Sequence, residues 1–100
     1  MPIDSLEHAR RLALEEARRG WTDEEDPIVI NDAVSYVTGY GWVFFYNLRS
    51  VIEGRKPLGL MGNGPIVVLR DDGSVHRIPA ARWRQALEDF EAALSARKSR

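Results

Sequence analysis

The stretch GYGWVFFY, residues 39–46, decides the fold because its aromatic side chains recur at every second position. That spacing is the repeat of a β-strand, whose successive side chains point to opposite faces. The rings at these positions belong to Tyr40, Trp42, Phe44 and Tyr46, and the last three share one face of the expected strand. Val43 and Phe45 make the other face apolar as well, which is typical of a central strand covered on both sides. We therefore expect these rings to fill a core rather than to form a binding platform.

The aromatic strand has a predicted partner just before it in the chain. Residues 28–37 are rich in β-branched and aromatic side chains, although Asn31 and Asp32 interrupt the run. Thr38 and Gly39 are turn candidates. Residues 28–37 and 41–47 therefore most simply form a hairpin.

A second hairpin is predicted further along. Residues 65–69 are a short apolar strand, and residues 75–79 return the chain after the turn sequence DDGS, residues 71–74. An Asp-Gly pair tolerates the positive φ angles that tight hairpin turns require. Between the two hairpins the chain is less regular, with one helical turn expected at residues 49–53 and ended by Gly54.

Both ends of the chain are predicted helices. Asp4 followed by Glu7 has the form of a capping box, and an apolar face with helical spacing runs through residues 4–19, with Gly20 at the left-handed position after it. This face is built largely of alanine, which lets the helix lie close to whatever it covers. A second amphipathic helix is predicted over residues 80–97 from the spacing of Trp83, Leu87, Phe90 and Leu94.

These elements predict the order αββββα. Strands joined by short turns form antiparallel sheets, and two one-sided helices need a surface to cover. We therefore expect a two-layer α+β fold, a four-stranded antiparallel sheet with both helices on one face. The 100 residues suit a single domain over residues 1–100, with a frayed tail at residues 97–100. An open hairpin edge is compatible with a homodimer.

The composition excludes several classes of protein. The absence of cysteine rules out disulfides and thiolate catalysis, and the net charge of −1 does not favour nucleic acid as a partner. No apolar run approaches the roughly 20 residues of a membrane helix. The N-terminus lacks the basic start and apolar stretch of a secretory signal. We expect a cytoplasmic protein with no membrane partner.

The sequence shows no pattern for a cofactor, a metal or catalysis. His8 and His76 stand far apart and match no metal-ligand spacing. The glycine-rich residues 59–64 precede Pro65 and a strand, whereas a phosphate-binding loop opens a helix. No serine has a legible base partner. We expect neither cofactor nor metal, and no enzyme.

Residues 38–45, TGYGWVFF, come close to the RNA-recognition signature K/R-G-F/Y-G/A-F-V-x-F/Y. Thr38 replaces the basic residue that would meet phosphate, and Trp42 is the other departure. The RNA-recognition module begins with a strand, whereas this chain begins with a predicted helix. The module also carries its second signature on a separate, earlier strand, whereas the nearest similar sequence here, VFFYNL, lies on the same strand as the first signature. RNA binding through Tyr40 and Trp42 is therefore the weakest of three hypotheses.

The connector before the first hairpin carries an acidic run. A solvated connector is the default interpretation of such a run. The alternative is an electrostatic handle for a basic partner, which would raise the association rate and fade with salt. Our predicted contact surface combines this run with one further carboxylate, and its residues are Asp23, Glu24, Glu25, Asp26 and Asp32.

The segments GWVFFYN and GNGPIVV, joined by a short helical link and followed by DDGSVHRIP, resemble the bacterial immunity protein 35 family. The resemblance covers residues 25–95. Members usually follow the aromatic strand with YLETGD, where this chain has SVIEGR at residues 50–55. The matching residues are of the structural kind, glycines for turns and aromatics for the core: Gly41, Trp42, Phe44, Tyr46, Gly62, Asn63, Gly64 and Pro65.

The resemblance implies a protein that neutralises a toxin by tight protein–protein contact and needs no catalysis. This toxin-binding role is our first hypothesis. The family overlaps small proteins with a proposed heat-shock role, so a chaperone-like or structural protein is the second. It would hold apolar segments on an exposed patch that includes Trp21, Tyr40 or Met61.

Overall fold

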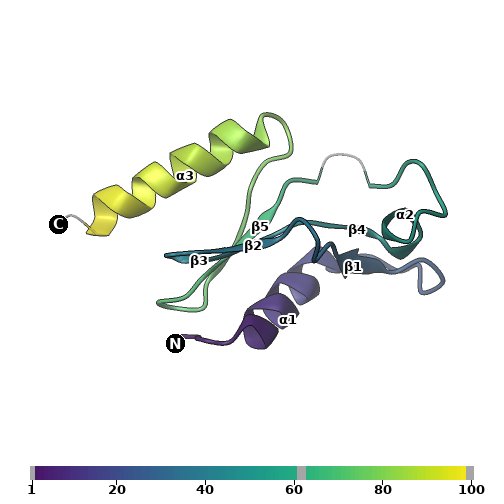
Figure 1. Cartoon of the computed structure of the whole chain (residues 1–100), viewed down its shortest axis with the longest axis horizontal. Helices are drawn as coiled ribbons and strands as arrows, with labels where there is room; N and C mark the ends of the chain where they lie inside the picture. The colour runs from purple at the N-terminus through teal and green to yellow at the C-terminus, as the bar shows by residue number, and fades with distance from the viewer. Residues whose placement is uncertain (1, 61–62, 99–100) are drawn as a thin grey trace.

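The computed structural model describes residues 2–60 and 63–98, and of Lys98 the backbone alone. Met61 and Gly62, named above as a patch residue and a motif residue, lie outside the described residues. In chain order the elements are α1 (Leu6–Ala17), β1 (Ile28–Ile30), β2 (Tyr36–Thr38), β3 (Gly41–Phe44), β4 (Tyr46–Leu48), α2 (Arg49–Ile52), β5 (Ile66–Leu69), β6 (Val75–Arg77) and α3 (Trp83–Lys98). The α+β class, the terminal helices and the antiparallel pairing are confirmed (Figure 1).

The prediction of one four-stranded sheet is wrong, because the first hairpin is broken midway into two sheets. One sheet pairs β1 with β4, and the other has the order β2-β3-β5-β6. At the break, the Asn31 N–H donates to the Phe45 carbonyl at 2.7 Å, and the Phe45 N–H donates to Ser35 Oγ at 2.9 Å. These bonds replace regular ladder bonds, so the interruption expected at Asn31 and Asp32 separates the ladders.

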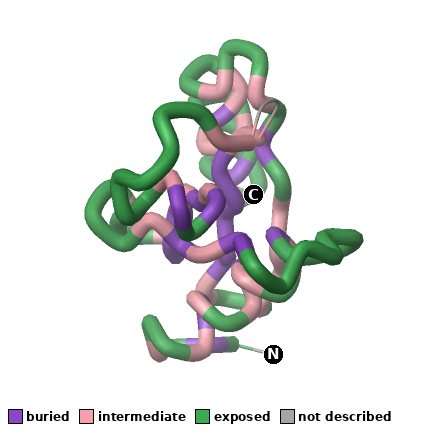
Figure 2. The backbone as a smooth tube through the Cα atoms, turned by 90° about the vertical axis from the view of Figure 1, so that its right-hand side faces the viewer, coloured by how far each residue is buried: buried purple, intermediate pink, exposed green. Residues whose placement is uncertain are grey.

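The two long helices lie on opposite faces of the four-stranded sheet, not on one face as predicted (Figure 1). Trp42, Phe44, Ile66 and Val68 pack with the alanines of α1. The alternate residues of the same strands, Val43, Val67 and Leu69, pack with Leu87 and Leu94 of α3. Both faces of β3 and β5 are apolar, so each face needs a cover, and each helix supplies one. Buried residues accordingly gather in the middle of the molecule, and the outer loops are mostly exposed (Figure 2). Among the strands, β1, β3, β4 and β5 contain the buried residues, whereas β2 and β6 have none.

Helix α1 begins one residue later than its capping box implied. Ser5 is the N-cap and accepts a hydrogen bond from the His8 N–H at 3.1 Å, so Asp4 is not the cap. The alanines of the predicted apolar face, Ala9, Ala13 and Ala17, are buried, whereas Leu6 at its start is 58% exposed. The expected helical turn after the aromatic strand is α2, and Gly54 follows it at φ 79°. Helix α3 runs to Lys98, so residues 97–98 of the expected tail are helical.

Two motif glycines stand where the backbone leaves no room for a side chain. A Cβ on Gly41, whose φ is 154°, would lie 2.0 Å from the Val68 carbonyl oxygen. A Cβ on Gly64 would lie 2.0 Å from the Ile78 carbonyl oxygen. Glycine is required at both positions because β3 and the loop before β5 press against neighbouring backbone. Among the described residues, no helix is long and apolar enough to cross a membrane.

Candidate functional site

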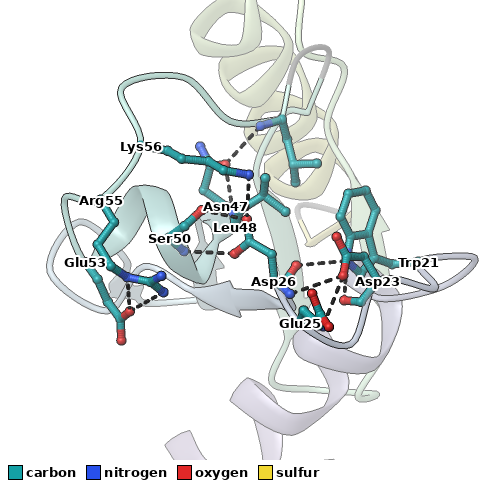
Figure 3. Close-up of polar contacts among 11 residues, drawn as sticks. Trp21, Asp23, Glu25, Asp26, Asn47, Leu48, Ser50, Glu53, Arg55 and Lys56 are labelled. Carbon is teal, nitrogen blue, oxygen red and sulfur yellow. Dashed lines mark hydrogen bonds and ion pairs between the residues drawn. The ribbon is translucent and has the colours of Figure 1, made fainter.

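The acidic run does not form one uniform surface, because Asp26 is buried within it. The Asp26 carboxylate accepts hydrogen bonds from the Ser50 N–H at 3.0 Å and from the Ser50 hydroxyl at 2.6 Å, and it pairs with Lys56 Nζ at 3.1 Å (Figure 3). These donors, the Ser50 hydroxyl foremost, lower the pKa of Asp26 to about 2. Asp26 therefore ties the connector to the N-terminus of α2.

Asp23 and Trp21 hold the shape of the same connector. Asp23 Oδ1 accepts hydrogen bonds from the backbone N–H groups of Glu25 and Asp26, at 3.0 and 3.3 Å. The Trp21 indole N–H donates to the carbonyls of Asp23 and Asp26, both at 3.1 Å (Figure 3). The Trp21 ring is 37% exposed while its polar end is bound. The connector is thus a built turn.

Asp32 lies at a different place and has its own partner. Its two carboxylate oxygens accept from Arg10 Nε at 2.8 Å and from Arg10 Nη2 at 2.9 Å. This bidentate contact with Arg10 lowers the pKa of Asp32. Of the five predicted contact carboxylates, Glu24 and Glu25 therefore remain exposed without a side-chain hydrogen bond to any residue that the structure describes.

The aromatic strand is core on the side of α1. Trp42 is 4% exposed, and the Arg70 guanidinium lies 4.5 Å from its ring centroid. Base stacking needs an open ring face, so Trp42 is not a platform for RNA. Tyr40 is half-buried, and its hydroxyl donates to the Glu91 carboxylate on α3. Burial first, and then Glu91, raises the pKa of Tyr40.

The remaining motif residues close the loop before β5. The Tyr46 carbonyl accepts a hydrogen bond from Asn63 Nδ2 at 2.9 Å, and Tyr46 itself is buried. Pro65 is fully buried, and Gly64 sits against Ile78 as described above. These contacts give the described motif residues a structural role at the loop before β5.

The structure also shows a groove that the sequence reasoning missed. It has a volume of about 460 Å³ and lies beside the N-terminus of α1 on the same face of the sheet. Trp42 and Phe44 form its floor, and Leu6 and Val37 stand at its rim with exposed fractions of 58% and 64%. The other lining residues are Asp4, Asp32, Ser35, Tyr36 and Arg70. Finding it requires the strand order, which no local pattern in the sequence provides.

No catalytic arrangement emerges in the part of the chain that the structure describes. No group of three or more histidine, aspartate and glutamate side chains there is placed to hold a metal ion. One contact chain joins Asp72, Ser74 and His76: Ser74 Oγ lies 2.6 Å from Asp72 Oδ1 and 2.8 Å from His76 Nε2. A catalytic triad places histidine between the acid and the hydroxyl, whereas here Ser74 is in the middle of the hydrogen-bonded chain.

The comparisons with known proteins give one family. Neither the curated proteins nor the solved structures contain a match to the chain. A family model described as Immunity protein 35 matches residues 7–93, which includes all three helices in part or whole and every strand. The match confirms the resemblance found in the aromatic strand and the glycine-rich loop. The chain belongs to the immunity protein 35 family.

Proposed function

We propose that this protein is an immunity protein that binds a toxin through protein–protein contact, blocks its action, and is not itself an enzyme. Membership of the immunity protein 35 family carries the proposal. A buried aromatic strand and internally bonded acidic residues support a rigid scaffold whose function lies on its surface. Such a scaffold suits tight binding because little conformational entropy is lost on association.

Part of the contact surface in this proposal is the tip of the acidic connector. Glu24 and Glu25 present the exposed charges, while Asp23 and Asp26 hold the turn that displays them. Asp32, which pairs with Arg10, lies outside the connector and contributes charge at most indirectly. Exposed carboxylates of this kind steer a basic partner and act mainly on the association rate.

The test begins with capture of the partner. Tagged protein is recovered from its own cells with and without ribonuclease, and bound proteins are identified by mass spectrometry. The proposal expects one stoichiometric protein that survives ribonuclease and whose toxicity is abolished by the purified immunity protein. A spread of unrelated unfolded clients would support the chaperone-like hypothesis instead, and loss of all partners on ribonuclease treatment would point to RNA.

The connector is tested by charge reversal. The double variant Glu24→Lys/Glu25→Lys should slow association with the captured toxin by about tenfold at low salt, with a smaller effect at high salt. The matched control is Glu15→Lys/Glu88→Lys, which makes the same change in net charge at exposed helical positions. Equal association rates for the two variants would remove the connector from the contact surface and leave the immunity function standing.

Asp26 should behave in the opposite way. Asp26→Asn is expected to lower the urea midpoint at pH 7, because the Ser50 and Lys56 donors lose their carboxylate. The folded-state pKa of about 2 lies below the ordinary value, so this stabilisation is complete above about pH 4 and lost as the pH falls through 2. Urea titrations of both proteins from pH 7 to pH 2 should therefore converge at the acid end. A variant that keeps its stability but loses toxin binding would make Asp26 a contact residue.

A further inference from the structure

The two edges of the four-stranded sheet differ in protection. The β6 edge carries Arg77, which pairs with Glu16 of α1 at 2.6 Å. The β2 edge consists of Tyr36, Val37 and Thr38, without charge or proline, and no strand of the described chain lies beyond it. Soluble proteins normally protect such edges with charges, prolines or covering segments. An open apolar edge is therefore a place where another chain can add a strand.

Exposed apolar side chains gather at this same edge. Leu6 and Val37 are exposed and line the groove over Trp42 and Phe44. Tyr36, on the same edge strand, is exposed too, and its register opposite Val43 turns its side chain toward the α3 side. Val34 is also exposed and lies in the turn that leads into β2. Four of the seven exposed large apolar residues in the described chain belong to this region, and the other three are Trp21, Ile52 and Leu58. Clustering of this kind marks an interaction surface, whereas single exposed apolar residues do not.

The charges around the groove favour a segment with a basic side chain. Asp4 and Asp32 line the groove on the side of α1, and Asp4 is exposed. Arg70 is the basic residue of the lining, but it stacks on Trp42 and donates to the Thr38 carbonyl at 3.2 Å. Asp4 is thus an exposed carboxylate residue in the lining, with no ion pair to any residue that the structure describes. An apolar groove with a carboxylate at its rim fits a strand that carries alternate apolar side chains and a lysine or arginine.

We propose that the β2 edge and this groove dock an extended segment of the protein partner, which adds a strand to β2, places an apolar side chain over Trp42 and Phe44, and turns a basic side chain toward Asp4. Main-chain hydrogen bonds supply affinity in this mode, and the groove supplies specificity. The inference rests on the proposed function in one respect, that the partner is a protein. It assigns the toxin a second contact besides the acidic connector.

A second copy of this chain fits the surface less well. A twofold dimer brings the same patch of both copies together, so the groove would face another groove and stay unfilled. Strand β2 has three residues, and such a short ladder falls well short of the roughly 800 Å² per partner that a stable interface buries. A partner segment fills the groove and leaves the rest of the interface to other surfaces.

Val37→Lys tests the proposal with the captured toxin domain as the probe. Val37 is 64% exposed, so lysine should fold normally there while placing a charge in the path of the added strand. Binding to the toxin should weaken at least about tenfold, which corresponds to about 1.4 kcal/mol. The control is Leu58→Lys at another exposed apolar position, 79% exposed, which should stay within about twofold of the original protein. Far-UV circular dichroism and thermal melting verify that both variants fold.

Each other outcome overturns the proposal. Toxin affinity unchanged by Val37→Lys removes the β2 edge from the interface while the immunity function stands. A protein that light scattering shows to be a dimer, and that Val37→Lys converts to a monomer, assigns the edge to a second copy.

A second probe separates this inference from the proposed function. A phage-displayed library of random twelve-residue peptides is selected on the whole protein, without any toxin. The inference expects peptides with alternating apolar residues and a lysine or arginine, whose binding is lost in Val37→Lys and weakened in Asp4→Asn. Selection of no peptide that depends on Val37 contradicts it. If such peptides appear but no toxin is captured, the docking edge stands and the immunity function falls.

Discussion

The two faces of the four-stranded sheet are covered in different ways by the two long helices. Helix α1 lies against its face through Ala9, Ala13 and Ala17, so its backbone approaches the strands closely. Helix α3 covers the other face with bulky side chains, including Trp83 and Phe90. Alternate residues of the same two strands thus support a close contact on one side and a deeper side-chain layer on the other.

The polar contacts of the two helices differ as well. Helix α1 is joined to distant elements by ion pairs, and its C-cap residue Arg18 donates from its guanidinium to the Ile28 carbonyl at 2.8 Å. Helix α3 reaches the first hairpin through the hydrogen bond from Tyr40 to Glu91. The edge-on contact of Trp83 with Phe45, at 5.1 Å between ring centroids, adds an aromatic contact. We therefore expect the closely packed α1 face to be the more stable half and the α3 face to depend on a few large side chains.

The largest expected effect comes from removing a ring on the α1 face. Phe44 is 2% exposed beneath α1, and Phe44→Ala should cost about 3–5 kcal/mol because alanines cannot close the cavity. Phe90 on α3 is only partly buried against its face, so Phe90→Ala should cost about half as much. Urea unfolding of both variants measures the difference. Equal losses would show that the two faces are packed alike.

A smaller effect is expected from the hydrogen bond that joins α3 to the hairpin. Tyr40→Phe should cost about 1 kcal/mol, because Glu91 loses its donor in a half-buried place. The folded-state pKa of Tyr40 is raised, so the tyrosine contributes stability below its ordinary pKa of about 10 and loses it as the pH rises further. Urea midpoints at pH 7 and pH 11 should therefore show a smaller gap between the two proteins at the higher pH. A gap that widens at pH 11 would contradict this assignment.

The elements that the sequence predicts well are those with a local signal. The hairpins follow from the two-residue repeat and from Asp72-Gly73, and α1 and α3 follow from their apolar faces with ends wrong by a few residues. Ser5 and Asp4 are both good caps, and the choice between them depends on local geometry that the sequence leaves open.

The features that the sequence could not predict depend on contacts between distant residues. A strand that is apolar on both faces shows that both are covered but not which helix covers which. In the sequence, Asp26 cannot be told apart from its acidic neighbours, because its bonding partners Ser50 and Lys56 lie 24 and 30 residues further along the chain. The groove needs Leu6, Val37 and Arg70 side by side, and only the strand order brings them together.

The smallest expected loss of stability comes from removing an ion pair of α1, and it separates the contribution of charge from that of packing on this face. Glu16 pairs with Arg77 at the sheet edge, and the Arg77 hydrogen bond lowers the pKa of Glu16. Both side chains are partly exposed, so Glu16→Gln should cost less than about 1 kcal/mol, with the loss shrinking in high salt. The contribution is present above the ordinary glutamate pKa of about 4.3 and is lost as the pH falls below it. Urea midpoints at low and high salt check this, with Tyr40→Phe as a control whose cost should change little with salt. The opposite result would be a loss of stability for Glu16→Gln that exceeds the loss for Tyr40→Phe and is the same in high salt. Hydrogen bonds that do not depend on charge would then hold α1 to the sheet edge as firmly as its alanines do. In that case the contrast between the two faces would not rest on packing.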